Sequence, residues 1–190
     1  NSLNTPTLSL NEVGVFRMTA TPPVATPPEG STVSTGYFGY TIPPASSVPV
    51  GRFVPWDYSL SGGFITPACS PFTYMSQPFA SGFVITARNR KGGTTQNYEG
   101  AFARGMAQMV AANALDGVDR SARITLTPAL DWVDGVASVN QQAPMLDNTR
   151  FDRGAAPEGP LSLLDVGMRV DDRDGGLTVL AGADMNPEIE

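Results

Sequence analysis

The chain has 190 residues, enough for one large domain or two small sandwich-type domains, and either can bury a hydrophobic core. Charged residues make up 16% of it, whereas ordinary soluble domains carry about 25%, and its 20 glycines and 17 prolines predict many short strands joined by rigid turns. The formal net charge of −6 and a pI near 4.6 argue against nucleic acid as a partner, because phosphate binding needs a cationic face.

Residue types that common catalytic and metal sites need are scarce in this sequence. The chain has no histidine, so the usual general base and neutral metal ligand are missing, and zinc, copper and iron sites are disfavoured. Paired carboxylates for glycoside cleavage would have to come from Glu99, Asp131 and Asp134, and their spacing selects no pair. Cys69, the only cysteine, is either a buried small hydrophobe or the partner of a cysteine outside this segment. The composition therefore favours a protein that is not an enzyme.

The N-terminal part of the chain predicts short strands separated by a proline-rich loop. Residues 12–21 alternate apolar and polar side chains from Val13 onward, which indicates a half-buried strand, and Pro22 ends it because proline cannot donate to a sheet ladder. Residues 22–34 carry four prolines and predict an exposed loop. Residues 37–42 predict a second short strand.

A linker is predicted between two domains. Residues 45–50 consist of small residues and prolines, which place a domain boundary near residue 48. Residues 1–48 are therefore expected to be the closing strands of an incomplete upstream β domain together with this proline-rich linker. Residues 49–190 are expected to form a second β-sandwich domain, with truncation at its C-terminus left as an alternative, since the chain lacks a starting Met and looks like a piece of a longer protein.

Segments of strand length, rich in aromatic and β-branched residues, recur through the rest of the chain. They are residues 51–60, which lead into a turn at 61–63, and residues 72–75, 83–87, 122–128, 133–139, 163–170 and 177–180. Residues 83–98 run from a β-prone stretch through a basic, glycine-rich corner into a polar stretch, which predicts two antiparallel strands and their turn. Turns are also predicted at Asp134-Gly135 and at Asp174-Gly175-Gly176.

One segment predicts a helix instead. Residues 101–115 are rich in Ala and Met, and they place Phe102, Met106, Met109 and Val110 at helical spacing. The fold expected for the whole chain is therefore all-β, built of antiparallel β-sandwich units of immunoglobulin-like type with at most one short helix.

An acidic cluster near the C-terminus is the candidate metal site. Asp172 and Asp174 are separated by one residue, and Gly175 follows them. This pattern resembles part of a calcium loop, since Ca²⁺ needs several hard oxygen ligands and a sharp turn that brings them together. Asp165 lies upstream and Asp184 downstream. The full EF-hand pattern is not present. A solvated acidic turn between two strands is the alternative, and no other cofactor is predicted.

Three residues are candidates for contact with a ligand or partner. Arg52 lies in an apolar run, where it either makes charge-assisted hydrogen bonds inside the protein or meets a ligand. Trp56 and Tyr98 could line a sugar-binding face, because aromatic rings stack on sugars. Packing in the core or on a sheet surface is the alternative for both rings.

Several motifs follow one another in the order found in a known family. They are the runs at residues 48–55, 69–79 and 86–102, with flanking motifs at 12–23, 157–160 and 172–175. Together they resemble the C-terminal region of MshQ-like proteins. These are large bacterial proteins associated with biogenesis of the mannose-sensitive haemagglutinin (MSHA) type IV pilus.

The resemblance implies a secreted protein at the surface of a Gram-negative bacterium, with no assigned enzyme activity and no established catalytic residues. We therefore expect a non-enzymatic structural or adhesive segment associated with type IV pilus biogenesis, whose partners are pilin-like or other cell-surface proteins. A carbohydrate-binding module of a larger adhesin, with glycans as partners, is the first alternative, and a fragment of an enzyme is the second. No stretch approaches the roughly 20 apolar residues that cross a bilayer, so no membrane span is expected in this segment.

Overall fold

The computed structural model describes residues 5, 7–22, 43–113, 117–126, 130–143, 149–161 and 164–181. In this part of the chain the secondary structure consists of β-strands and two single-turn 3₁₀ segments, η1 (Gly100–Phe102) and η2 (Ser121–Arg123). The strands pair antiparallel throughout, so the prediction of an all-β fold with antiparallel sheets is confirmed. No helix of the described residues is long and apolar enough to cross a membrane.

The chain divides into two compact units. Gly14–Phe53 form one, called here the small unit, and Asn1–Val13 with Val54–Glu190 form the other, called the large unit. The predicted boundary near residue 48 lies inside the small unit. Val13 is buried in the core of the large unit, and the Glu12 carboxylate accepts hydrogen bonds from the backbone N–H groups of Gln96 and Asn97 at 3.2 and 3.1 Å. Residues 12 and 13 therefore pack with the downstream strands.

The described residues of the small unit form two short antiparallel strand pairs. They are β1 (Gly14–Phe16) with β4 (Val50–Phe53), and β2 (Thr19–Ala20) with β3 (Ala45–Ser46). The rings of Phe16 and Phe53 pack with their centroids 5.7 Å apart. The single strand predicted at 12–21 is thus divided into β1 and β2. The predicted strand at 37–42, and all but the first residue of the predicted loop at 22–34, lie outside the described residues.

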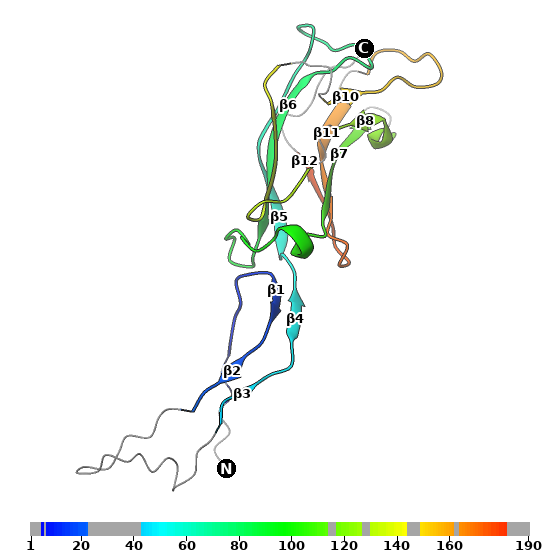
Figure 1. The fold of residues 1–190 in the computed structure, drawn as a ribbon. Helices are drawn as coiled ribbons and strands as arrows, with labels where there is room; N and C mark the ends of the chain where they lie inside the picture. The colour runs from blue at the N-terminus through cyan, green and yellow to red at the C-terminus, as the bar shows by residue number, and fades with distance from the viewer. Residues whose placement is uncertain are drawn as a thin grey trace, which may run out of the picture. The chain divides into compact units, whose positions relative to one another are not determined.

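In the large unit, the described residues form two three-stranded antiparallel sheets and one further strand pair (Figure 1). One sheet has the order β5 (Asp57–Thr66), β6 (Ala80–Arg88), β9 (Val136–Gln141). The other has the order β12 (Leu177–Ala181), β11 (Leu164–Asp171), β7 (Met106–Asn113). β8 (Ile124–Thr125) pairs with β10 (Arg150–Phe151).

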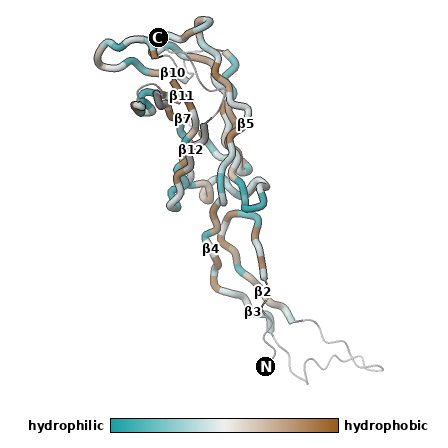
Figure 2. The backbone as a smooth tube through the Cα atoms, turned by 180° about the vertical axis from the view of Figure 1, so that it is seen from behind, coloured by the Kyte–Doolittle hydropathy of each residue, from teal (hydrophilic) through white to brown (hydrophobic). Residues whose placement is uncertain are grey.

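The core of the large unit lies where side chains from both sheets meet. β11 buries every second residue, as Leu164, Val166, Met168 and Val170, and these pack in one cluster with side chains of β6 and β9 such as Phe83. This alternation is what a strand with one face in the core requires. Figure 2 shows brown, hydrophobic residues along the strands, and many teal, hydrophilic ones at the turns between them.

The predicted helix at 101–115 is wrong. Its first residues form η1, and Met106–Asn113 form β7, which pairs with β11 over its full length. Met109 and Ala111 are buried on the core side, as the period of two of a strand requires, whereas Met106 is 43% exposed. Intrinsic preference for a helix is worth tenths of a kilocalorie per residue, and the sheet pairing and burial outweigh it.

Two other predictions also fail for local reasons. β5 runs straight through the turn predicted at 61–63, where the pairing with β6 shifts register between Ser61 and Phe64, so the glycines form a β-bulge instead. In place of the strand predicted at 72–75, Gln77 donates its backbone N–H to the Tyr74 carbonyl in one turn, and an isolated bridge between Cys69 and Phe72 closes another. Cys69 is free and partly buried in this turn.

The predicted turns at the other glycine positions are confirmed. Asp134 and Gly135 have φ values of 49° and 77°, the combination of a type I′ turn, and Val133 and Val136 exchange backbone hydrogen bonds of 2.9 Å around them. β11 and β12 form the predicted hairpin around residues 174–176. After β6 the chain turns back, with a bridge between Arg88 and Thr94, so the predicted turn is confirmed although its second strand is reduced to one bridge.

Candidate functional site

Tyr98 lies in a buried cluster of three aromatic rings, together with Tyr58 and Trp132. The ring centroids are 5.0 to 6.1 Å apart, and the two tyrosine hydroxyls are 3.0 Å apart. The Tyr98 hydroxyl accepts the N–H of Gly105 at 2.9 Å, and the Trp132 indole donates to the Gly105 carbonyl at 2.8 Å. Since Tyr98 is only 1% exposed, it cannot stack on a sugar at the surface. Tyr98 is therefore a core residue and not the ligand contact that the sequence predicted.

The hydroxyl of Tyr58 is held in its neutral form. Burial raises the pKa of Tyr58 far above its ordinary value, and the hydrogen bond with Tyr98 and the nearby carboxylates of Asp172 and Asp174 raise it further. In the unfolded chain the hydroxyl titrates near its ordinary value of about 10. The unfolded state therefore loses this proton first, so the contribution of Tyr58 to stability is complete below that pH and decreases above it.

We expect the free energy of unfolding to fall as the pH rises above about 10. Chemical denaturation followed at a series of alkaline pH values measures this dependence. Replacing the group that titrates, in Tyr58→Phe, should make the decrease shallower. An identical pH dependence in Tyr58→Phe and the unchanged protein would show that the hydroxyl does not contribute to it.

The acidic turn between β11 and β12 uses Asp172 as an internal acceptor. One carboxylate oxygen of Asp172, Oδ1, accepts the backbone N–H groups of Asp174 and Gly176 at 2.8 and 2.7 Å. The Asp171 carboxylate accepts the N–H of Arg173 at 2.9 Å in the same way. A Cβ at Gly176 would collide with the Asp172 carboxylate, a side-chain group that would then have to move. These carboxylates therefore stabilise the hairpin turn.

The turn offers a calcium ion few ligands. Among the residues that the structure describes, no group of three or more His, Cys, Asp or Glu side chains could hold a metal ion. Nη1 of Arg104 also lies 3.8 Å from Oδ1 of Asp174, and this positive charge competes with a cation there. The arrangement of Asp172 and Asp174 fits the alternative prediction, an acidic turn, better than a calcium loop.

Calcium is expected to leave the melting temperature unchanged. A ligand that binds only the folded state must raise this temperature, so thermal melts with chelator and with added Ca²⁺ should coincide. Asp172→Ala should nevertheless lower the free energy of unfolding by about 1–2 kcal/mol, because two backbone N–H groups lose their acceptor. A rise with Ca²⁺ that Asp172→Ala abolishes would instead establish a metal site.

Trp56 and Arg52 differ in their surroundings. Trp56 directly precedes β5, its backbone N–H donates to the Arg88 carbonyl at 2.8 Å, and its side chain is 64% exposed. Arg90 places its guanidinium carbon 5.1 Å from the centre of the Trp56 ring. Arg52 is partly buried in β4 of the small unit. Of the two predicted rings in the large unit, Tyr98 lies in the core and Trp56 is exposed.

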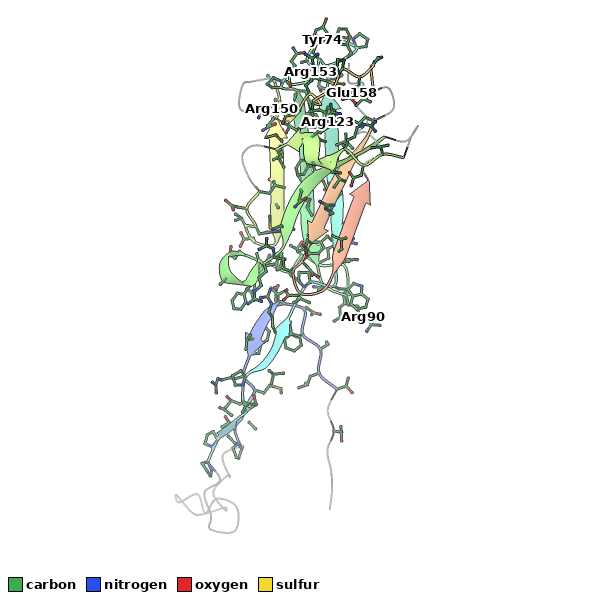
Figure 3. The ribbon with its side chains drawn as sticks, turned by 90° about the vertical axis from the view of Figure 1, so that its right-hand side faces the viewer. Tyr74, Arg90, Arg123, Arg150, Arg153 and Glu158 are labelled. Carbon is green, nitrogen blue, oxygen red and sulfur yellow. The ribbon has the colours of Figure 1, made fainter. Side chains whose placement is uncertain are left out.

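A charged cluster that the sequence did not reveal is centred on Arg123. Its Nη1 forms an ion pair with Glu158, its Nε donates to the Asp152 carbonyl at 2.8 Å, and its guanidinium carbon lies 4.3 Å from the centre of the Phe151 ring. Figure 3 shows Arg123, Arg150 and Glu158 together at one end of the large unit, with Arg90 at the other end. Arg123 therefore links the segment around Glu158 to the end of β10.

Asp152 is the second centre of this cluster. Its two carboxylate oxygens accept from Nε of Arg150 and from the hydroxyl of Thr125, each at 2.8 Å. Burial opposes the charged form, but these hydrogen bonds and the charges of Arg150 and Arg123 together lower the pKa of Asp152. The cluster joins the segment of Arg123 and Thr125 to a second, separate segment around Asp152, so no spacing in the sequence could have predicted it.

The carboxylates considered for glycoside cleavage are those of Glu99, Asp131 and Asp134. Glu99 accepts the backbone N–H of Asp134 at 3.4 Å, so its carboxylate supports the type I′ turn. Asp131 and Asp134 are exposed. Nothing in this geometry assigns one of them as an acid and another as a base.

Comparison with protein families gives a match over nearly the whole chain. Residues 12–189 match the family model described as DUF6701, third domain. The chain belongs to this family. The DUF6701 third domain therefore includes the small unit and most of the large unit, and the predicted boundary near residue 48 lies inside it. Comparisons with curated proteins and with solved structures gave no match.

Proposed function

We propose that this segment is a non-enzymatic structural or adhesive part of a secreted bacterial surface protein, associated with biogenesis of an MSHA-like type IV pilus. The link to the pilus rests on the resemblance of the sequence motifs to MshQ-like proteins. What supports a structural or adhesive role is that the polar clusters of the large unit are engaged in holding the fold. Its partners would be pilin-like or other cell-surface proteins.

Two titratable groups of the large unit, the Asp152 carboxylate and the Tyr58 hydroxyl, are poorly suited to proton transfer. Hydrogen bonds lower the pKa of Asp152, and burial raises the pKa of Tyr58, so neither group changes protonation near neutral pH. A general acid or base works best with a pKa close to the working pH. The Asp172 carboxylate is occupied by two N–H groups of its own turn. These side chains serve the stability of a module that must survive outside the cell.

Immunogold labelling of intact cells, with an antibody raised against residues 54–190, tests the proposed location. We expect label on the cell envelope and on pili, with none on cells that lack the gene. Label confined to the cytoplasm would reject a surface role. An in-frame deletion of residues 12–189 that leaves pilus number and adhesion at their normal values would reject the association with the pilus.

A carbohydrate-binding module is the second candidate, and the exposed Trp56 ring favours it. Binding to an array of glycans should give hits that Trp56→Ala abolishes. A substitution of Tyr98 does not test this idea, because it would disturb the core. An array without reproducible hits would leave the structural role alone.

A further inference from the structure

We propose that Trp56, Arg90 and Lys91 form a binding site for an acidic sugar, a pyranose that carries a carboxylate. The site rests on the adhesive role proposed above and names its ligand class. Trp56 offers a ring that remains 64% exposed although Arg90 lies against it, with the guanidinium carbon 5.1 Å from the ring centre. A cation at this distance is attracted to the ring. This attraction keeps the positive charge of Arg90 beside an exposed aromatic surface.

The turn that carries the two cations is fixed by hydrogen bonds on both sides. The N–H of Asn89 donates to the Gly93 carbonyl and the N–H of Gly92 donates to the Asn89 carbonyl, each at 2.8 Å. The Asn89 side chain accepts the N–H of Lys91 at 2.9 Å and donates to the carbonyl of Asn11 at 3.0 Å. Because this backbone is already ordered, a ligand that meets its side chains need not bear the cost of ordering the loop.

The strand ends beneath the turn are also fixed. Arg88 and Asp57 form a bidentate ion pair, with Nε to Oδ1 at 2.8 Å and Nη2 to Oδ2 at 2.9 Å. Asp57 directly follows Trp56 in the chain. Asp57 therefore neutralises Arg88. In the described part of the chain, no carboxylate lies within ion-pair distance of Arg90 or Lys91. Within the described residues the turn thus presents two positive charges without an ion pair, on a protein whose net charge is −6.

An acidic sugar matches this combination better than other anions do. The apolar C–H face of a pyranose stacks on an indole, and a carboxylate accepts charge-assisted hydrogen bonds from a guanidinium or an ammonium. A neutral sugar would use only the ring. A nucleic acid would bring many phosphates to a chain with excess negative charge. Two cations would neutralise only two of these phosphates, so few counterions would be released from the nucleic acid and binding would be weak. A single carboxylate on a sugar requires only the charges that this turn supplies.

Titration of the whole protein with methyl β-glucuronide, methyl β-glucoside and a single-stranded DNA oligonucleotide tests the proposal. The indole N–H signal of Trp56 in a two-dimensional NMR spectrum reports binding, and the signal of buried Trp132 serves as an internal reference. We expect the glucuronide to shift the Trp56 signal and to bind at least about tenfold more tightly than the glucoside, as one charge-assisted hydrogen bond predicts. Equal binding of both sugars, binding of neither, or a preference for DNA would overturn it.

Variants separate the contributions of ring and charge. Arg90→Gln with Lys91→Gln should remove the preference for the glucuronide, and Trp56→Ala should remove binding of both sugars. Both sets of substitutions are at exposed positions, so the fold should persist. Tyr74→Ala and Arg153→Gln are the matched controls, because they change an exposed ring and an exposed arginine at the opposite end of the large unit (Figure 3). A loss of binding in these controls as well would contradict the assigned site.

This test is independent of the location experiment. Surface label on cells without any glucuronide binding would leave the adhesive role and reject the sugar site. Glucuronide binding by a protein found only in the cytoplasm would retain the site and reject the proposed role.

Discussion

Tyr98→Ala is expected to lower the free energy of unfolding by about 3–5 kcal/mol, the range for removing a large buried aromatic side chain. The side chain is 1% exposed, and its ring packs 5.0 Å from Trp132 and 6.1 Å from Tyr58, measured between centroids. Truncation would open a cavity among these rings and leave the N–H of Gly105 without its acceptor. Denaturant unfolding followed by fluorescence of the tryptophans measures the loss.

Two further variants make this prediction specific. Tyr98→Phe keeps the ring but removes the hydroxyl that Gly105 and Tyr58 contact, so we expect a loss of about 1–3 kcal/mol. Trp56→Ala removes a larger side chain from an exposed position and should change stability by no more than about 0.5 kcal/mol. If Tyr98→Ala and Trp56→Ala had the same effect on stability, the burial of Tyr98 described here would be contradicted.

The turns of this fold could be predicted because their residues determine the backbone locally. Asp134 and Gly135 both require positive φ, and few residue pairs other than Asp-Gly or Asn-Gly adopt this readily. β6 was also predictable, since it is rich in apolar and β-branched residues and lies at the centre of a sheet, with Phe83 and Ile85 buried. These features need no information from distant parts of the chain.

The features that failed depend on distant partners. Met106–Asn113 form a strand because β11 pairs with them, although β11 begins at Leu164. The glycines near residue 62 continue β5 as a bulge because Gly82 on β6 makes room for the Phe64 ring, and a Cβ on Gly82 would collide with that ring. Neither local propensity nor spacing contains this information.

The candidate sites show the same limit. Trp56 and Tyr98 are both aromatic residues in β-prone sequence, but one is exposed and the other is in the core. The Arg123 cluster was missed altogether, because its contacts to Phe151 and Glu158 bring together segments that are separate in the chain. Residue type alone identified possible contacts, and only the packing assigned their roles.

Gly135→Ala is expected to lower the free energy of unfolding by about 2–4 kcal/mol, the sum of backbone strain and overpacking. Its φ of 77° is one that L-residues rarely adopt, and a Cβ there would collide with the carbonyl oxygen of Thr95. That oxygen belongs to the backbone and cannot rotate away as a side chain would. The N–H of Gly135 donates to the carbonyl of Tyr98 at 3.2 Å, and its carbonyl accepts the N–H of Ala87 at 2.8 Å, so the turn cannot shift without losing both hydrogen bonds.

Gly62→Ala is the matched control, because Gly62 has a φ of 62° but nothing within 4 Å of where a Cβ would lie. It should cost about 1–2 kcal/mol, the penalty of the left-handed conformation alone. Thermal and denaturant unfolding of both variants measures the difference, which isolates the collision with Thr95. Equal losses would mean that the backbone around Thr95 can move away from the added Cβ. In that case the contact between this turn and residues 94–98 would not fix the position of Tyr98 in the aromatic cluster. A larger loss for Gly135→Ala would instead show that one tight turn fixes the start of β9 and the aromatic core together.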